Sequence, residues 1–221
     1  MNAPPAFGAR AADGPQATSA PDEIFVALAR QLQLPALDGS HGRVVGLTSS
    51  LPGEGVTTIL CGLAAAVAER AERGILLIDA NRARPRLSTS WGGELIPGWT
   101  EVSQGAVSLD NAVRTAPIRN TWRLPPGGGF PSATEAAELV AECRERFAAT
   151  LVDLPPPGSG RDAGPLAAAL DGIVLVVEAE RVGRATVRRT AKLIERAGAR
   201  VLGVVFNKQR TYMPEWLSAR M

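Results

Sequence analysis

Short runs of consecutive apolar residues alternate with longer stretches in which apolar residues recur at three- and four-residue spacings. The runs cover residues 43–48, 74–80, 149–154, 172–177 and 200–207, and the longer stretches cover residues 57–72 and 184–199. Continuous Val/Ile/Leu runs are typical of strands covered on both faces of a sheet, and helical stretches between them favour right-handed parallel crossovers. The pattern predicts an α/β fold with a doubly wound, mostly parallel sheet.

The beginning of the chain shows no such pattern. Residues 1–21 are rich in Ala, Pro and Gly and are predicted to form a disordered arm. Asp22 then opens a short amphipathic helix. The apolar face of this helix consists of Ile24, Phe25, Leu28 and Leu32. The predicted organisation is an arm over residues 1–21, one α/β domain over residues 22–214 and a tail over residues 215–221.

Charge and composition exclude several classes of function. The net charge of +2 implies neither a nucleic-acid partner nor an anionic membrane surface. No stretch approaches 18 consecutive apolar residues and no signal peptide is present, so the protein is expected in the cytoplasm without a membrane span of its own. Cys61 and Cys143 match no metal-binding spacing and are expected to be free thiols, and the single histidine, His41, is expected to have no catalytic role.

Polar residues follow four of the predicted strands at the point where each strand ends. They lie at residues 48–58, at Asp79–Asn81, at Asp153 and at Asn207. In open parallel sheets, ligands bind beyond the carboxyl ends of the strands. The sequence therefore predicts a binding site at this rim of the sheet.

The segment after the first strand has the composition of a phosphate-binding loop that leads into a helix. Glycines let the backbone N–H groups point inward, and the helix N-terminus adds a positive dipole end. The predicted phosphate-binding residues are Pro52, Gly53, Glu54, Gly55, Val56, Thr57 and Thr58. Thr57, Asp79 and Asp153 are expected to hold the magnesium ion of ATP, and the two aspartates are also the candidate catalytic groups. The alternatives are a simple Gly/Pro turn and aspartates that only cap helices.

Val56 stands where a phosphate-binding loop has its lysine. Loss of one charge-assisted hydrogen bond weakens binding by about ten- to a hundredfold, and loss of a donor aimed at the transition state costs about 10²–10³ in rate. ATP and magnesium binding are therefore expected to be weakened, and catalysis more so. Neither lysine of the chain, Lys192 or Lys208, lies in the loop, so the expected compensating charge is Arg82 or Arg84, just past the second strand.

Several motifs occur together in a characteristic order. Residues 49–58 (SSLPGEGVTT) match the loop S-x-x-P-G-E-G-K-[ST]-[ST], residues 76–85 (LLIDANRARP) match I-D-A-D followed by basic residues and Pro, and residues 151–156 (LVDLPP) match I-D-T-P-P. The chain thereby resembles the cytoplasmic ATPase domain of the bacterial tyrosine autokinases of capsular and exopolysaccharide synthesis, within the MinD/ParA-like P-loop class. The resemblance covers residues 22–214 and implies that Asn207 contacts adenine.

The chain departs from this family's pattern at catalytic positions. Val56 replaces the loop lysine, and Asn81 replaces the second aspartate of I-D-A-D, which the family uses as an acid–base group. Tyr212 is the only tyrosine, whereas active members end in a cluster of tyrosines. The family's ring-assembly motif, E-x-x-R-x-x-R, would fall on Glu23, Val26 and Ala29. Both arginines are absent, so assembly into a ring is not expected.

The resemblance implies a kinase-like protein with weak or no catalysis. It would act as the cytoplasmic regulator of an integral inner-membrane polysaccharide copolymerase or chain-length regulator, and would reach the membrane through that partner. One alternative is an active, divergent tyrosine kinase or ATPase that uses Arg82 or Arg84. Another is a MinD/ParA-type positioning ATPase, which is disfavoured because Leu51 replaces the early loop lysine and the short tail carries one arginine.

Overall fold

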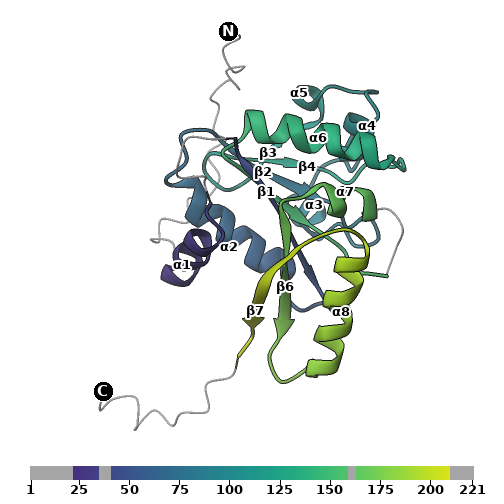
Figure 1. The fold of residues 1–221 in the computed structure, drawn as a ribbon. Coiled ribbons are helices and arrows are strands. Elements are labelled where there is room, and N and C mark those ends of the chain that lie inside the picture. The colour runs from purple at the N-terminus through teal and green to yellow at the C-terminus, as the bar shows by residue number, and fades with distance from the viewer. Residues whose placement is uncertain (1–21, 35–40, 159–162, 210–221) are drawn as a thin grey trace.

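The computed structural model describes residues 22–34, 41–158 and 163–209. The predicted arm, the predicted tail and Tyr212 lie outside these residues, so the division of the chain stays a prediction. The strands of the described part are β1 (Arg43–Ser49), β2 (Ile75–Asp79), β3 (Arg114–Thr115), β4 (Thr121–Leu124), β5 (Ala149–Asp153), β6 (Gly172–Glu178) and β7 (Val201–Asn207). They form one sheet in the order β3-β4-β2-β5-β1-β6-β7 (Figure 1).

Helices connect the strands and cover both faces of this sheet (Figure 1). They are α1 (Glu23–Gln31), α2 (Val56–Ala68), α3 (Arg86–Ser90), α4 (Trp99–Ser103), α5 (Leu109–Ala112), α6 (Ala133–Arg146), α7 (Gly164–Ala169) and α8 (Arg184–Arg196). Every strand pair is parallel except β3 with β4. The predicted doubly wound, mostly parallel sheet is therefore confirmed.

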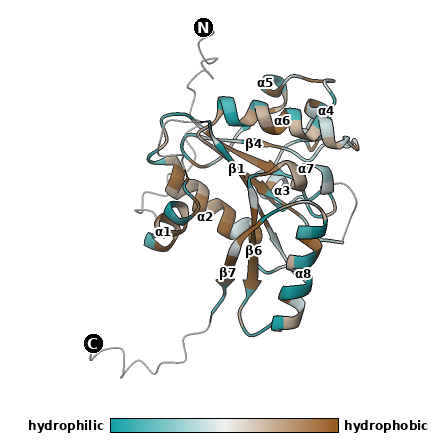
Figure 2. Cartoon of the chain, viewed as in Figure 1, coloured by the Kyte–Doolittle hydropathy of each residue, from teal (hydrophilic) through white to brown (hydrophobic). Residues whose placement is uncertain are grey.

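The core consists of two clusters of buried side chains, one on each face of the sheet. One cluster joins the sheet to α1, α2 and Leu87 of α3, and the other joins it to α4 through α8. Successive residues of β2 alternate between them, because Ile75 and Leu77 belong to the first cluster and Leu76 and Ile78 to the second. This two-sided burial explains the continuous apolar runs, which Figure 2 shows along the strands.

The first helix begins where it was predicted, but its buried face is narrower. The Asp22 carboxylate accepts a hydrogen bond from the N–H of Ile24 at 3.1 Å and so caps α1. The prediction that Ile24 lies on the apolar face is wrong, because its side chain is 71% exposed. Phe25 and Leu28 pack against the core instead, and the ring of Phe25 lies directly over Gly62 of α2.

Residues 81–148 contain elements that the apolar pattern does not reveal. Strand β4 has only four residues and carries Arg123, which is 7% exposed and donates a hydrogen bond to the carbonyl of Ser88 at 3.0 Å. A buried arginine interrupts the apolar run by which a strand is recognised.

The state of the cysteines and the lengths of the helices agree with what the sequence predicts. Cys61 and Cys143 are free thiols, and burial raises the pKa of each to about 12, so both are unreactive at neutral pH. None of the helices in the described part of the chain has the length and apolar character that a membrane span requires.

Candidate functional site

The loop between β1 and α2 has the backbone shape of a phosphate cradle. Gly53 and Gly55 adopt left-handed conformations, with φ angles of 87° and 95°, which other residues rarely adopt. Helix α2 begins at Val56 without a side-chain cap and without an acidic residue in its first turn. No capping side chain therefore occupies the N-terminus of α2, which favours the binding of an external anion there.

The side chain of Val56 belongs to the core rather than to the loop. It is half-buried and packs against the cluster of apolar residues between the sheet and α2. Its two methyl groups therefore contribute to the packing of the helix start. They supply no charge at the place where a phosphate-binding loop has its lysine.

Glu54 braces the loop from inside. Its side chain is fully buried, and its carboxylate accepts hydrogen bonds from the N–H groups of Leu51 at 2.8 Å and of Glu178 at 3.1 Å. Its backbone carbonyl accepts a hydrogen bond from the side-chain amide of Asn207 at 2.8 Å. These bonds tie the loop to the ends of β6 and β7, so the protein itself holds the shape of the cradle.

Two aspartates lie side by side on the rim beside this loop. Asp79 ends β2 and Asp153 ends β5, and they are direct partners in the register of the two strands. Both are buried, with 0% and 3% of their surface exposed. The hydroxyl of Thr57, in the first turn of α2, donates a hydrogen bond to the Asp153 carboxylate at 2.6 Å. The structure thus brings together the three residues that were predicted to hold magnesium.

Burial dominates the ionisation of both carboxyl groups. It raises the pKa of Asp153 to about 7; the hydrogen bond from Thr57 opposes the rise, and the neighbouring Asp79 carboxylate adds to it. Burial also raises the pKa of Asp79, although hydrogen bonds from Ser88 and Asn81 act in the opposite direction. Hydroxyl and carboxylate oxygens are the ligands that magnesium prefers, so Thr57 and Asp153 fit this ion.

The turn after β2 depends on the two polar residues of the second motif. Asp79 accepts hydrogen bonds from the N–H groups of Asn81 at 3.2 Å and Ser88 at 2.9 Å. The side-chain oxygen of Asn81 accepts a hydrogen bond from the N–H of Arg84 at 3.2 Å. Asn81 is therefore a turn-forming residue here, and an amide cannot act as the acid–base group expected at this position.

The arginines predicted to compensate for the missing lysine are placed differently from each other. The Arg82 guanidinium donates to the carbonyls of Gly128 and Gly129 at 3.0 and 3.3 Å and lies over the ring of Phe130, 4.3 Å from its centre. Arg84 is exposed. The charge of Arg86, which begins α3, lowers the pKa of Asp153 and so acts on the rim directly.

Lys208 lies beside the loop, although the sequence pattern does not place it there. Its ammonium group donates hydrogen bonds to the carbonyl of Gly53 at 2.9 Å and to the Glu178 carboxylate at 3.2 Å. Arg181 binds the same carboxylate at 2.8 Å, and its guanidinium lies 4.0 Å from where a side chain on Gly53 would begin. The position of Lys208 directly after Asn207, at the end of β7, is the sequence signal that could have placed it at the rim.

Comparison with known sequences places this geometry in a family. No family model matches the chain. It is 27% identical over 194 residues to the tyrosine-protein kinase CpsD of Streptococcus agalactiae, which covers 85% of this chain and 83% of that protein. It is 30% identical over 194 residues to the tyrosine-protein kinase CpsD of Streptococcus pneumoniae, which covers 85% of this chain and 84% of that protein. The chain belongs to the bacterial tyrosine kinase family.

A further relative is a larger protein. The succinoglycan biosynthesis transport protein ExoP of Rhizobium meliloti is 30% identical over 201 residues, which are 86% of this chain but only 25% of ExoP.

Solved structures agree with the membership in the kinase family. The kinase domain of VpsO is 28% identical and superimposes with a TM-score of 0.62 over 84% of this chain and 93% of that one. The chimeric protein CapA2B2, at 23% identity, shares the fold with a TM-score of 0.73 over 89% of this chain and 88% of that one. The septum site-determining protein MinD of Pyrococcus horikoshii, solved with Mg-ADP, shares the fold with 19% identity and a TM-score of 0.60 over 80% and 75%. The predicted family and the MinD/ParA-like fold class are thereby confirmed.

Proposed function

We propose that this chain is a kinase-like protein with weak or no catalysis that regulates a polysaccharide copolymerase or chain-length regulator of the inner membrane from its cytoplasmic side. Membership in the kinase family and the relationship to a succinoglycan transport protein support the link to exopolysaccharide synthesis and export. The packing of Val56 into the core carries the weak-catalysis part of the proposal.

The loop would still bind nucleotide phosphates through its backbone. The N–H groups at the start of α2 and the two left-handed glycines provide the cradle, which Glu54 holds in shape. Thr57 and Asp153 would hold magnesium, which neutralises charge on the phosphates when bound. Asp153 must lose its proton for this role, and its raised pKa makes that loss incomplete at neutral pH. The adenine contact of Asn207 stays a prediction, since its side chain amide is bonded to Glu54.

Incubation of the purified chain with labelled ATP and magnesium tests the proposal. Because Tyr212 is the only tyrosine, Tyr212→Phe is a clean control for tyrosine autophosphorylation. We expect no label on the wild type. The double variant Val56→Lys, Asn81→Asp restores the loop lysine and the acid–base carboxylate, and we expect it to incorporate label. Strong incorporation into the wild type that disappears in Tyr212→Phe would refute the weak-catalysis part of the proposal.

The partner is tested separately from catalysis. Affinity purification of the tagged chain from cells lysed in detergent should bring down an integral membrane protein of polysaccharide export. The Val56→Lys variant serves as a control, because the proposed partnership does not depend on phosphoryl transfer. Recovery of the chain alone, at the same yield with and without detergent, would count against a membrane partner.

A second candidate function is an active, divergent tyrosine kinase, and the position of Lys208 favours it. An ammonium group 2.9 Å from the Gly53 carbonyl, beside the Arg181 guanidinium, puts two cations next to the loop that lacks its own lysine. A lysine that swings from the carbonyl to a bound phosphate would restore part of the missing charge.

Calorimetry with ATP and magnesium distinguishes the two candidates. Lys208→Met should lower the affinity about ten- to a hundredfold if Lys208 contacts phosphate. Lys192→Met, which removes the other lysine from the exposed side of α8, is the matched control. Arg82→Ala and Arg84→Ala test the compensation predicted from the sequence. An unchanged affinity for ATP in Lys208→Met would show that Lys208 does not replace the missing loop lysine.

A further inference from the structure

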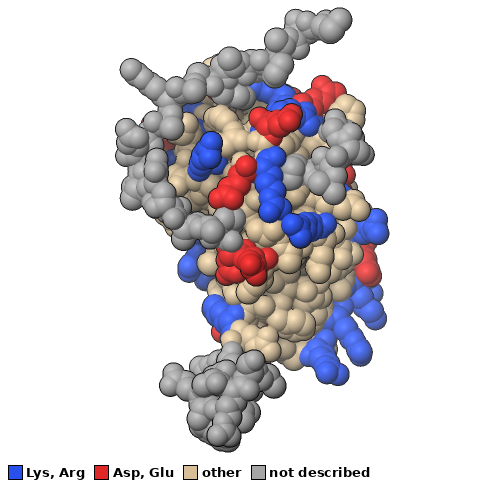
Figure 3. All heavy atoms as spheres, turned by 90° about the vertical axis from the view of Figure 1, so that its left-hand side faces the viewer, with Lys and Arg blue, Asp and Glu red and all other residues tan. Residues whose placement is uncertain are grey.

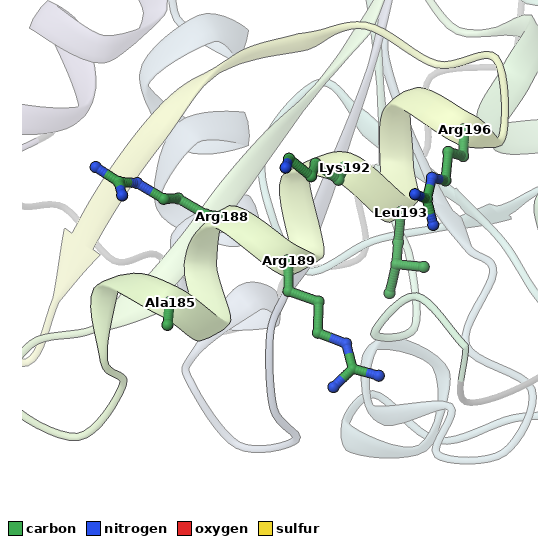
Figure 4. A pocket seen from close by; sticks show the side chains of 6 residues that line it. All are labelled: Ala185, Arg188, Arg189, Lys192, Leu193 and Arg196. Atoms are coloured by element: carbon green, nitrogen blue, oxygen red, sulfur yellow. The ribbon is translucent and has the colours of Figure 1, made fainter.

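Helix α8 presents one strongly basic surface. Its exposed cations, which we call the basic face of α8, are Arg184, Arg188, Arg189, Lys192 and Arg196. Thr190 and Ile194 on the opposite side are buried against the sheet. A hollow of 490 Å³ lies between the exposed side chains, and the described residues that line it all belong to α8 (Figure 4).

The charge of this surface is not balanced nearby. The helix carries five cations and one carboxylate, Glu195, a net charge of +4 against +2 for the entire chain. None of the ion pairs between described residues involves a cation of α8. Figure 3, which faces the left-hand side of Figure 1 and so looks onto the side away from α8, shows acidic and basic side chains interspersed over its upper half.

Most of this arrangement is unfavourable for the helix, although Arg196 in the last turn is well placed at the negative end of the dipole. Arg184, Arg188, Lys192 and Arg196 follow one another at four-residue steps, and like charges at this spacing repel each other along a helix. Arg184 also lies in the first turn of the helix, near the positive end of its dipole. An external anion would offset both unfavourable terms.

The geometry points to an extended anionic surface. The row from Arg184 to Arg196 is about 18 Å long at 1.5 Å per residue. Figure 4 shows the side chains of Arg188, Arg189, Lys192 and Arg196 spreading apart from the helix, so their charged ends do not converge on one point. A small free anion would contact only one or two of them, whereas a plane of phosphates would contact all.

We propose that the basic face of α8 docks onto the anionic phospholipid headgroups of a membrane. Protein interfaces need buried apolar or aromatic anchors, but the hollow contains one partly exposed leucine, Leu193 at 37%, and no groove between elements. No aromatic side chain lines the hollow, as stacking on single-stranded nucleic acid would require. Charge alone suffices for a lipid surface, on which each basic residue adds to the binding.

Sedimentation of the full chain with vesicles tests this docking directly. We expect binding to vesicles of phosphatidylcholine with 30% phosphatidylglycerol, little binding to pure phosphatidylcholine, and release by salt. The triple variant Arg188→Gln, Arg189→Gln, Lys192→Gln should lower the partition coefficient by about a hundredfold, at about fivefold for each cation removed. Equal binding of the wild type to both vesicles, or binding that salt does not weaken, would overturn the proposal without any variant.

A matched control removes the same charge elsewhere. Arg30, Arg70 and Arg119 are exposed on other elements, and their triple change to Gln leaves α8 intact. We expect this variant to bind as the wild type does. An equal loss in both triple variants would mean that net charge alone is responsible, and would overturn the assignment to α8.

Competition with a DNA duplex at equal phosphate concentration completes the test, because preferential binding to the duplex would assign the surface to nucleic acid instead. Nucleotide binding and catalysis play no part in this assay.

Discussion

Replacing Asp153 by asparagine should stabilise the protein at neutral and alkaline pH. Burial raises the pKa of Asp153 from 3.8 to about 7, so the folded state holds a proton that the unfolded chain releases near pH 4. Between these values the folded state binds more protons than the unfolded state, and the free energy of unfolding falls as the pH rises. Above pH 7 the Asp153 carboxylate is charged in the folded state, and the free energy of unfolding is lowered by the full cost of burying that charge.

The size of this cost follows from the shift. About three pKa units at 1.36 kcal/mol each give an upper value of about 4 kcal/mol. Asparagine is neutral in both states and its side-chain oxygen can still accept the hydrogen bond of Thr57. We therefore expect Asp153→Asn to raise the free energy of unfolding by about 2–4 kcal/mol at pH 8, and to leave it nearly unchanged at pH 4.

Urea unfolding of wild type and variant from pH 4 to pH 8, in a chelator, measures this difference. The exposed carboxylate of Glu72 provides the control, since Glu72→Gln should change the stability by less than about 0.5 kcal/mol at every pH. A difference between Asp153→Asn and wild type that is the same at pH 4 and pH 8 would refute the reasoning, as would a destabilised variant at pH 8.

Three further predictions concern the loop and its ion. Val56→Lys should raise the affinity for ATP ten- to a hundredfold in calorimetry and lower the free energy of unfolding by about 1–2 kcal/mol, because the valine packs against the core; an unchanged affinity would contradict the phosphate cradle. Glu54→Ala should cost about 2–4 kcal/mol in urea unfolding, because the N–H groups of Leu51 and Glu178 lose their acceptor; a cost below about 0.5 kcal/mol would show that the brace is dispensable. Magnesium should raise the melting temperature more at pH 8 than at pH 6, because Asp153, with its pKa raised to about 7, must first release its proton. Equal shifts at the two pH values would exclude Asp153 as a ligand.

The parts of the fold that the sequence predicts are those with a strong apolar signal. Strands β1, β2, β5 and β6 lie within one or two residues of the predicted runs, because each is buried on both faces and has no polar side to interrupt the pattern. Strand β7 matches its run equally well, although it lies at the edge of the sheet and its residues are half-buried or exposed. Their order along the chain also predicts the rim, since parallel strands bring Asp79 and Asp153 to one edge.

The region between β2 and β5 lacks such a signal. The burial of Arg123 hides β4, and the apolar residues of α6 are few, although its start has a capping box. Ser132 and Glu135 exchange side-chain to backbone hydrogen bonds there, and their three-residue spacing could have revealed the helix.

At the candidate site, the sequence identifies the loop and the aspartates but not their surroundings. The end of the last strand places Lys208 at the rim, but the group that its ammonium contacts there depends on how β7 and the loop are placed in space. Lys208 therefore lies at Gly53, whereas Arg82, closer in the sequence to the second motif, is bonded to Gly128 and Gly129.

The brace around Glu54 has a consequence for how the protein folds. The hydrogen bonds that shape the loop join residues far apart in the chain, 124 positions for Glu178 and 153 for Asn207, and Thr57 lies 96 positions from Asp153. Contacts of such separation form slowly, because long segments must be ordered before the contacts can form. The loop therefore reaches its native shape only after β6 and β7 have joined the sheet. During synthesis the loop therefore has no completed brace until residue 207 has left the ribosome.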